Sequence, residues 1–490
     1  MIPREAFLRA TAAMLGLAVM PRPAPGDQPP TPDPESPTAT VHSVRDLRFG
    51  QAPTIPAAPG IDPAGDAYAL MAPGTRSPAA HPIPGKLLLY SEAGGRRHLL
   101  RIPDRWNGSL VVAGTPGTRS EFANDGIWSD FALARGYAFA SSNKGIPYNA
   151  VVEPLADAAV HGVAYPIPFD VDGLESKQMA IRAGVLTPQR IGIASWNDDF
   201  GHLIEFARLT LRVERGALPV RTYAVGLSNG GAQVRSALEN FPELLDGGVE
   251  YAAPRWTPER SLLDLLPPFL SAMPGYIESG FADPVASKAI QDAGFPADVR
   301  QSDAGHPSLW CDYYSNVAPF YNDLTLFVYA LLIDPEATAT DALTATTPNP
   351  RNPRLLPGTP SGDGLAQPAA RAAYTPSSSA RDTIVAFAHT GAIERPLISL
   401  AGTRDILVPA DFHAVGYAQA VAAAGHEKLH RLYLIREGTH FDSFAAFGYG
   451  LQPQLPFAWA AFDQLVRTVE HGETRDLGTT QTISAPSEIE

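Results

Sequence analysis

The 490-residue sequence predicts an α/β fold, in which a mostly parallel sheet is flanked by helices and interrupted by one large inserted lid domain. Two observations predict this fold. Short apolar segments alternate with amphipathic helical segments over residues 61–253 and again over 394–475, a pattern typical of parallel strands covered by helices on both faces. Between these blocks, residues 254–393 are rich in proline and aromatic residues and break the alternation, which indicates the insertion.

The individual elements follow from the local pattern. A hairpin is expected over 86–102, where two apolar segments flank the Gly94-Gly95 pair. Apolar runs between turn residues predict further strands over 109–114, 138–142, 222–226, 247–253, 396–402 and 429–435. Apolar residues at helical spacing predict helices over 130–136, 200–216, 230–241, 412–425 and 455–471.

The two ends of the chain carry other signals. Arg4 and Arg9 precede the apolar stretch "ATAAMLGLAVM" (10–20), which resembles the core of a secretory signal peptide. Residues 21–60 are rich in proline and predict an extended linker that packs against nothing, and residues 476–490 are expected to form a tail. We therefore expect a secreted or periplasmic protein, with the cytoplasm as the alternative if the apolar stretch is an ordinary N-terminus.

Composition excludes several classes of function. The formal net charge of -14 disfavours nucleic acid and anionic membrane surfaces as partners. A single cysteine, Cys311, excludes an intrachain disulfide and every cysteine-based metal motif. No apolar run reaches the roughly 18 residues that a membrane-spanning helix needs. A weakly charged small-molecule or oligomeric substrate suits this composition, whereas the oligomeric state is not fixed by the sequence.

The turn "GLSNG" (226–230) lies between an expected strand and an expected helix. It matches G-x-S-x-G, the pattern of a strained strand-to-helix turn that exposes a nucleophilic serine above a sheet. Its flanking glycines are expected because side chains there would collide with neighbouring backbone. Ser228 is therefore the predicted nucleophile, and the start of the following helix offers backbone N–H groups to a developing oxyanion.

A serine hydroxyl needs a base to take its proton. His440 follows the last expected strand, in "YLIREGTHFDS", where a loop would return it to the edge of the sheet that carries Ser228. Three other histidines, His413, His426 and His430, lie on or beside the preceding helix and strand and are expected to be solvated surface residues. His440 is therefore the predicted base.

A third group must orient the base. Asp405 lies just past the expected strand 396–402, which makes it the predicted acid. Asp411 begins the next expected helix, where a capping or first-turn carboxylate explains it, and Asp442 is too close to His440 in sequence to need a special role. The chain order Ser228, Asp405, His440 is that of α/β-hydrolases.

The oxyanion formed by attack of Ser228 needs at least two N–H donors. Asn229 supplies the first by its position after the serine. The second is expected from the loop "GTPGT" (114–118), where either Thr115 or Gly117 could donate, since Pro116 has no N–H.

Two acidic segments have an alternative interpretation as metal sites. "WNDDFGH" (196–202) contains Asp198, Asp199 and His202, but their position just before an expected helix suits capping charges better. "DPEATATD" (334–341) has the acidity of a calcium loop, although an acidic surface explains it better. We expect no metal, and no glycine pattern for a phosphate or dinucleotide cofactor is present.

Longer stretches carry a family resemblance. "WNGSLVVAG", "FALARGYAFASSNKG", "YAVGLSNGGAQVRSALENFPELLDGGVEYAAPRW" and the Asp405 and His440 loops resemble bacterial α/β-hydrolases of the tannase and feruloyl esterase type, and also 3-hydroxybutyrate oligomer hydrolases. The resemblance implies that residues 254–393 form a lid that shapes the substrate pocket. Tannase-type enzymes carry a cysteine before the serine and another after the histidine, bridged beneath these residues, whereas this chain has Leu227 and Phe441 there.

Together these features predict a cofactor-free serine carboxylic-ester hydrolase that works through an acyl-enzyme. The expected substrates are bulky, weakly charged esters, either aromatic acid esters or hydroxyalkanoate oligomers. The insertion 254–393 is rich in aromatic residues, and pockets for larger ligands are lined mainly by apolar and aromatic groups. An amidase or peptidase with the same residues is the first alternative, and a non-catalytic binding protein on the same scaffold is the second.

Overall fold

A computed structural model gives the structure of the chain. It describes residues 38–49, 67, 70–72, 75–91, 96–117, 119–145, 193–297, 322, 325–326, 329–330, 332–337, 373–442, 445, 450–472 and 477–489. Cys311, the apolar stretch 10–20 and the second half of the acidic segment 334–341 lie outside these residues.

The described residues form one ten-stranded sheet in the order β1-β2-β3-β5-β4-β6-β7-β8-β9-β10. Its strands are β1 (Thr38–Val44), β2 (Gly85–Ser91), β3 (Arg97–Pro103), β4 (Ser109–Gly114), β5 (Ala138–Ser142), β6 (Arg221–Leu227), β7 (Gly247–Tyr251), β8 (Leu397–Gly402), β9 (His430–Ile435) and β10 (Thr480–Ile483). The pairs β1–β2, β2–β3 and β3–β5 are antiparallel, and every pair from β5 to β10 is parallel. This mostly parallel sheet confirms the predicted α/β-hydrolase fold.

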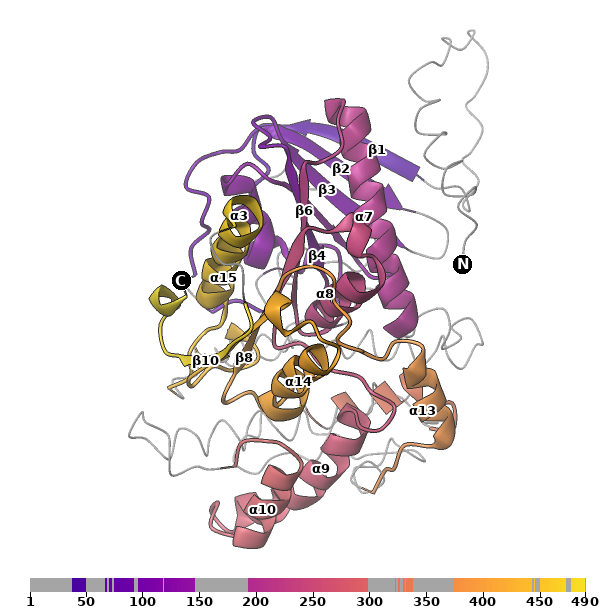
Figure 1. Cartoon of the computed structure of the whole chain (residues 1–490), viewed down its shortest axis with the longest axis vertical. Coiled ribbons are helices and arrows are strands. Elements are labelled where there is room, and N and C mark those ends of the chain that lie inside the picture. Colours follow the sequence, from indigo (N-terminus) through magenta and orange to yellow (C-terminus); the bar gives the residue numbers. More distant parts are fainter. Residues whose placement is uncertain are drawn as a thin grey trace, which may run out of the picture.

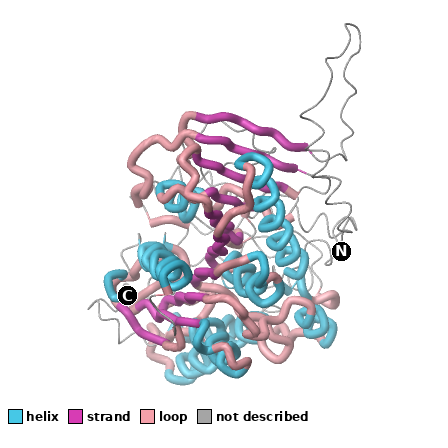
Figure 2. Tube along the Cα trace, turned by 45° about the horizontal axis from the view of Figure 1, so that its top comes forward, coloured by secondary structure: helices cyan, strands magenta, loops and turns pink. Residues whose placement is uncertain are grey.

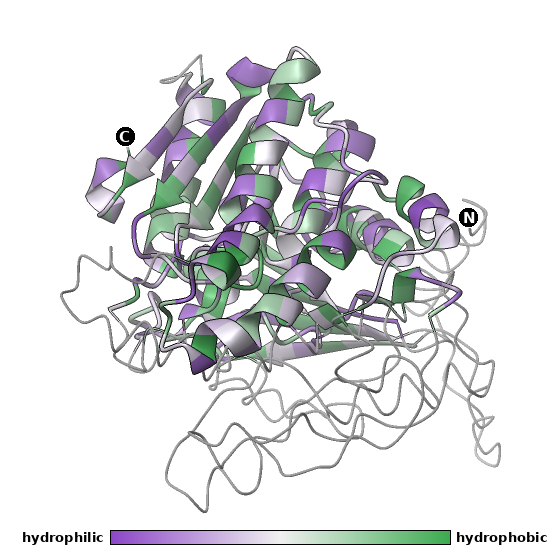
Figure 3. Cartoon of the chain, turned by 90° about the horizontal axis from the view of Figure 1, so that it is seen from below, coloured by the Kyte–Doolittle hydropathy of each residue, from purple (hydrophilic) through white to green (hydrophobic). Residues whose placement is uncertain are grey.

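Helices cover both faces of the sheet (Figures 1 and 2). On one face lie α3 (Asp130–Ala134) and α15 (Leu455–Val466), and on the other lie α7 (Ile193–Arg215), α8 (Asn229–Asn240) and α14 (Gly416–Ala423). Successive strand residues point to opposite faces, so Val111 of β4 packs in the same cluster as Phe131 and Phe462, whereas Leu110 packs with Phe200 and the other face. The helices mix hydrophobic and hydrophilic residues, as expected for elements that pack through one face (Figure 3).

The two ends of the chain differ from the sequence-based expectation. Part of the expected linker forms β1, which pairs with β2, and Leu47 just after it is fully buried. The expected tail forms β10, which pairs with β9, and Leu477 and Ile483 join the core. Both are edge strands that leave most of their side chains exposed or half-exposed, so neither has the apolar pattern by which buried strands are recognised.

The described part of residues 254–393 contains α9 (Leu262–Glu278), α10 (Pro284–Asp292) and α13 (Ser378–Val385), which lie together at the lower end of the molecule (Figure 1). Trp256, Phe269 and Tyr276 are buried in apolar packing. Asp334 is buried rather than a surface acid, and it accepts hydrogen bonds from the Tyr374 hydroxyl and the Ser377 hydroxyl, each at 2.6 Å. That this insertion acts as a lid stays a prediction.

None of the helices in the described residues combines the length and apolar character that crossing a bilayer would require.

Candidate active site

The turn at Ser228 joins β6 to α8. Ser228 has φ 56° and ψ −124°. This backbone conformation is unfavourable for any residue other than glycine, and it persists only where the surrounding structure enforces it. Two hydrogen bonds hold it: the Ser228 N–H donates to the Tyr251 carbonyl at 3.0 Å, and the Ser228 carbonyl accepts from Ala232 N–H at 3.0 Å. The side chain is thereby carried out beyond the end of the strand.

The glycines of this turn serve close packing. A Cβ added to Gly226 would overlap the backbone of Gly230, and one added to Gly230 would overlap the carbonyl of Gly114 at the end of β4. A Cβ at Gly114 would in turn overlap the Gly230 carbonyl. None of the three has a positive φ, so it is the contact between α8 and the strand ends that requires glycine, whereas the unusual dihedral angles fall on Ser228.

We expect Gly226→Ala to lower the free energy of unfolding by about 2 to 3 kcal/mol, because its methyl group would force α8 away from the sheet. Gly275→Ala is the matched control, since a Cβ there meets nothing nearer than 3.9 Å within α9. Urea unfolding of the two variants measures the difference. Equal stability of both variants would mean that α8 can move away from the end of β6 at little cost, contrary to the close packing at this turn.

His440 and Asp405 lie where the sequence predicted them, beside Ser228. His440 Nε2 lies 3.0 Å from Ser228 Oγ, and His440 Nδ1 lies 2.7 Å from Asp405 Oδ2. Ser228 is 7% exposed, and His440 and Asp405 are each 1% exposed. The three side chains therefore form a continuous, nearly buried chain of hydrogen bonds.

The loops after β8 and β9 meet through a second pair of glycines. A Cβ on Gly402 would overlap the Gly438 carbonyl, and the Arg404 N–H donates to that same carbonyl at 2.9 Å. This contact brings the two loops together so that Asp405 and His440 can pair.

Asp405 is fixed independently of His440. Its Oδ1 accepts the N–H groups of Leu407 and Val408, both at 2.8 Å, which leaves Oδ2 directed at the imidazole. Asp411, the alternative acid, lies exposed in the first turn of the helix 411–415, in agreement with the structural role expected for it.

Asp442 has a role that the sequence did not indicate. It is buried and accepts the N–H groups of Gln454 and Leu455 at 2.6 and 3.0 Å, so it caps the N-terminus of α15. The Gln454 side chain also donates to the Thr439 carbonyl. These contacts hold the loop on both sides of His440. Burial raises the pKa of Asp442 to about 7.

The expected oxyanion donors differ in whether their N–H groups already have a hydrogen-bond acceptor. Asn229 is the first residue of α8, where helix geometry leaves N–H groups without intrahelical acceptors. The Thr115 N–H donates to Gln233 Oε1 at 3.0 Å, and its hydroxyl donates to the Ser142 carbonyl. The Thr115 amide is therefore already engaged with α8, which favours Gly117 of the two expected donors. Gly117 stays the predicted second donor.

The acidic segment 196–202 also differs from expectation. It lies inside α7 rather than before it, and Asp199 is fully buried instead of capping the helix. Asp199 accepts the Ser142 hydroxyl at 2.6 Å and pairs with Arg96 Nε at 2.6 Å, so it fastens α7 to the sheet. No group of three or more histidine, cysteine or acidic side chains arranged for a metal occurs among the described residues.

Two histidines expected at the surface are buried. His413 Nδ1 accepts the Arg255 N–H at 2.9 Å, and His430 Nε2 lies 2.8 Å from Ser399 Oγ. His389 is also buried. Burial lowers the pKa of His430 to about 3 and that of His389 to about 4, and it holds the pKa of His413 well below its usual value. All three are therefore neutral at pH 7.

Because these three histidines are buried as neutral rings, we expect acid to lower the free energy of unfolding. In the unfolded chain each histidine is protonated near the ordinary histidine pKa of about 6.5, whereas in the folded chain it stays neutral until much lower pH. Their stabilising effect is therefore complete above about pH 6.5 and is lost as pH falls towards about 4. Asp442, whose folded pKa is raised, opposes this by one proton. The remaining two protons give a loss on the order of 3 kcal/mol per pH unit between about pH 6 and pH 5.

Urea unfolding at pH 7, 6 and 5 measures this slope. Replacing His389 with Gln should reduce this slope by about one proton, which is on the order of 1 kcal/mol per pH unit. A free energy of unfolding that stays constant from pH 7 to pH 5 would contradict the burial of these rings as neutral groups.

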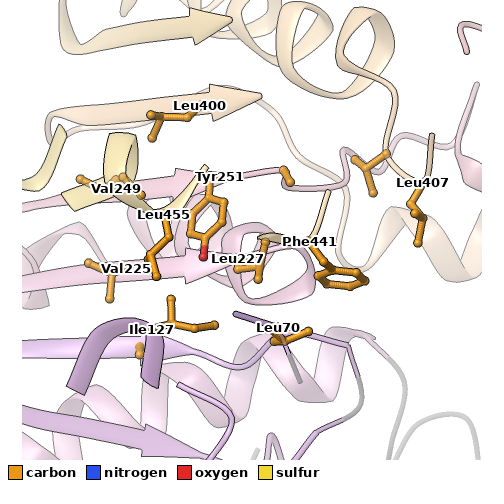
Figure 4. Packing of buried hydrophobic residues seen from close by; sticks show 14 of the residues in the cluster. Leu70, Ile127, Val225, Leu227, Val249, Tyr251, Leu400, Leu407, Phe441 and Leu455 are labelled. Atoms are coloured by element: carbon orange, nitrogen blue, oxygen red, sulfur yellow. The ribbon is translucent and has the colours of Figure 1, made fainter. Parts of the chain in front are cut away.

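Leu227 and Phe441 occupy the positions where the resembling tannase-type enzymes carry cysteines. Both are buried and belong to the same apolar cluster, part of which is drawn in Figure 4. Apolar core residues therefore stand in this chain where those enzymes carry the two cysteines.

No protein-family model and no curated protein matches the sequence. Among solved structures, feruloyl esterase B from Aspergillus oryzae is 14% identical over 89% of this chain and 88% of its own, with a TM-score of 0.44. Tannin acyl hydrolase from Aspergillus niger is 13% identical over 91% and 86%, with a TM-score of 0.44. An acylaminoacyl peptidase from Pyrococcus horikoshii is 11% identical over 78% and 40%, with a TM-score of 0.35. At these values the likeness carries no information on substrate, and the fold assignment rests on the strand order and the turn at Ser228.

Proposed function

We propose that the chain is a serine carboxylic-ester hydrolase. His440 Nε2 takes the proton of Ser228 Oγ, and Oγ attacks the ester carbonyl carbon. The resulting oxyanion is bound by the N–H groups of Asn229 and Gly117. Its collapse expels the alcohol, which receives the proton from His440 and leaves an acyl group on Ser228. Water, deprotonated by His440, then releases the acid and restores the hydroxyl.

One observation carries this proposal: the unbroken path from Ser228 Oγ to His440 Nε2 at 3.0 Å and from His440 Nδ1 to Asp405 Oδ2 at 2.7 Å. A carboxylate on Nδ1 keeps the hydrogen on that nitrogen, so that Nε2 is free to accept the serine proton. The strained φ of Ser228 gives further support, because such conformations persist where a site requires them.

The proposed substrates are bulky, weakly charged esters, either aromatic acid esters or hydroxyalkanoate oligomers. The net charge of -14 disfavours polyanionic substrates on approach, and the size of the insertion favours a pocket larger than acetate needs. We also propose a secreted or periplasmic location, which sequencing the N-terminus of protein from its host would test: an intact Met1 would contradict it.

A hydrolysis panel tests the reaction and the substrate class together. It compares short acyl esters, aryl esters of aromatic acids, and hydroxyalkanoate oligomers, each beside the amide of the same acid. The proposal expects turnover of the esters, with larger kcat/KM for the bulky ones. An amide hydrolysed as fast as its matched ester would favour the amidase or peptidase alternative. No turnover of any member would favour a non-catalytic binding protein.

A further inference from the structure

Residue 329 of the insertion contacts the residue next to Ser228. The Tyr329 hydroxyl donates to Asn229 Oδ1 at 2.7 Å, across 100 positions in the sequence. Tyr329 is 8% exposed and Asn229 is 4% exposed. Burial raises the pKa of Tyr329, so its hydroxyl keeps its proton and acts as the donor.

The other end of the Asn229 carboxamide reaches the loop after β4. Its Nδ2 donates to the Gly117 carbonyl at 3.1 Å, and the Lys144 ammonium donates to the same carbonyl. Gly117 has φ 51°, a left-handed conformation in which glycine is easily redirected unless it is held. The Asn229 side chain thus joins the insertion to the loop that carries the proposed second oxyanion donor.

Tyr329 is itself held in place. Its ring packs edge to face with Trp256, with centroids 5.0 Å apart. The backbone N–H of Trp256 donates to His389 Nδ1 at 3.1 Å, and His389 Nε2 donates to the Ala232 carbonyl at 3.1 Å. The beginning and end of the insertion are therefore joined to each other and to α8, close to Asn229 along that helix.

We propose that Tyr329 is a positioning residue for the oxyanion site, acting through the side chain of Asn229. By holding Asn229 it anchors the Gly117 carbonyl, and this limits how far Gly117, whose N–H is the proposed second donor, can shift in its loop. The inference rests on the proposed function. It also extends the role of the insertion, which then supports the chemical step on every ester, whatever it contributes to selecting bulky ones.

Tyr329→Phe removes only the hydroxyl that donates to Asn229. We expect kcat to fall about tenfold on p-nitrophenyl acetate and on a bulky aryl ester alike, with KM nearly unchanged, because the lost alignment affects the transition state. Affinity for a trifluoromethyl ketone, which forms a tetrahedral oxyanion adduct, should fall by the same factor as kcat/KM. Tyr276→Phe is the control, because that buried hydroxyl, also in the insertion, donates to the backbone carbonyl of Ala297.

A double-mutant cycle tests the route through Asn229. Tyr329→Phe should change kcat less than about twofold in the Asn229→Ala background. A tenfold loss in both backgrounds, or a loss confined to KM or to the bulky ester, would overturn the inference. If Tyr329→Phe does not fold, Asn229→Asp keeps the acceptor for Tyr329 but cannot donate to Gly117, and unchanged kcat in that variant would overturn the inference equally. These results are separate from the proposed function, which is tested by the hydrolysis panel and by the activity of Ser228→Ala.

Discussion

Ser228→Ala is expected to lower kcat on an ester by about 10^4 to 10^6. The variant has no Oγ to receive the acyl group, and His440 Nε2 loses the partner that lies 3.0 Å away. The remaining groups can still bind the oxyanion, so a small rate above the uncatalysed reaction should persist. Initial rates on p-nitrophenyl acetate with active-site-titrated protein measure the loss.

His440→Ala should cost a similar factor, and the double variant little more, because the two residues act as one unit. Ser236→Ala is the matched control, since Ser236 lies further along the same helix, α8, and is also buried. It should keep nearly full activity. Retention of more than a tenth of the activity by Ser228→Ala would show that the mechanism is wrong.

Asp405→Asn is expected to fold normally and to lose about 10^4 in kcat. The amide oxygen of asparagine can still accept the N–H groups of Leu407 and Val408, so the loop should keep its shape. Its NH2 group, however, would face His440 Nδ1 as a donor. The imidazole would then carry its hydrogen on Nε2 and could not take the proton of Ser228.

Asp411→Asn is the comparison for Asp405. Asp411 is exposed in the first turn of a short helix, and its substitution should change kcat little. Circular dichroism and thermal unfolding would establish that both variants are folded before their rates are compared. The opposite ranking of the two variants would transfer the role of the acid to Asp411.

The sequence predicted those parts of the fold that have a local signal. Buried strands such as β4 and β8 are continuous apolar runs, and glycines mark the turn at Ser228. Ser228, Asp405 and His440 could be chosen because each follows the end of a parallel strand, and such ends share one edge of the sheet. The edge strands β1 and β10 carry no such signal, since most of their residues face solvent.

The contacts around the site could not be predicted, because they join residues distant in sequence. Asp442 caps a helix that begins 13 positions later, and Tyr329 reaches Asn229 across 100. Thr115 has the position of an oxyanion donor, and only the approach of Gln233 from α8 reveals that its N–H is already used. Such pairings depend on how the elements pack, which no local pattern encodes.

Labelling with a fluorophosphonate tests the central claim most directly, because the reagent phosphonylates a serine only when a base activates it. After reaction at pH 7, peptide mapping by mass spectrometry should locate a single adduct on Ser228. The adduct should be absent from Ser228→Ala and strongly reduced in His440→Ala, while Ser236→Ala labels as fully as the unmodified protein. Two results would contradict the account: ester hydrolysis that continues after the reaction while Ser228 carries no label, or labelling of His440→Ala at the original rate.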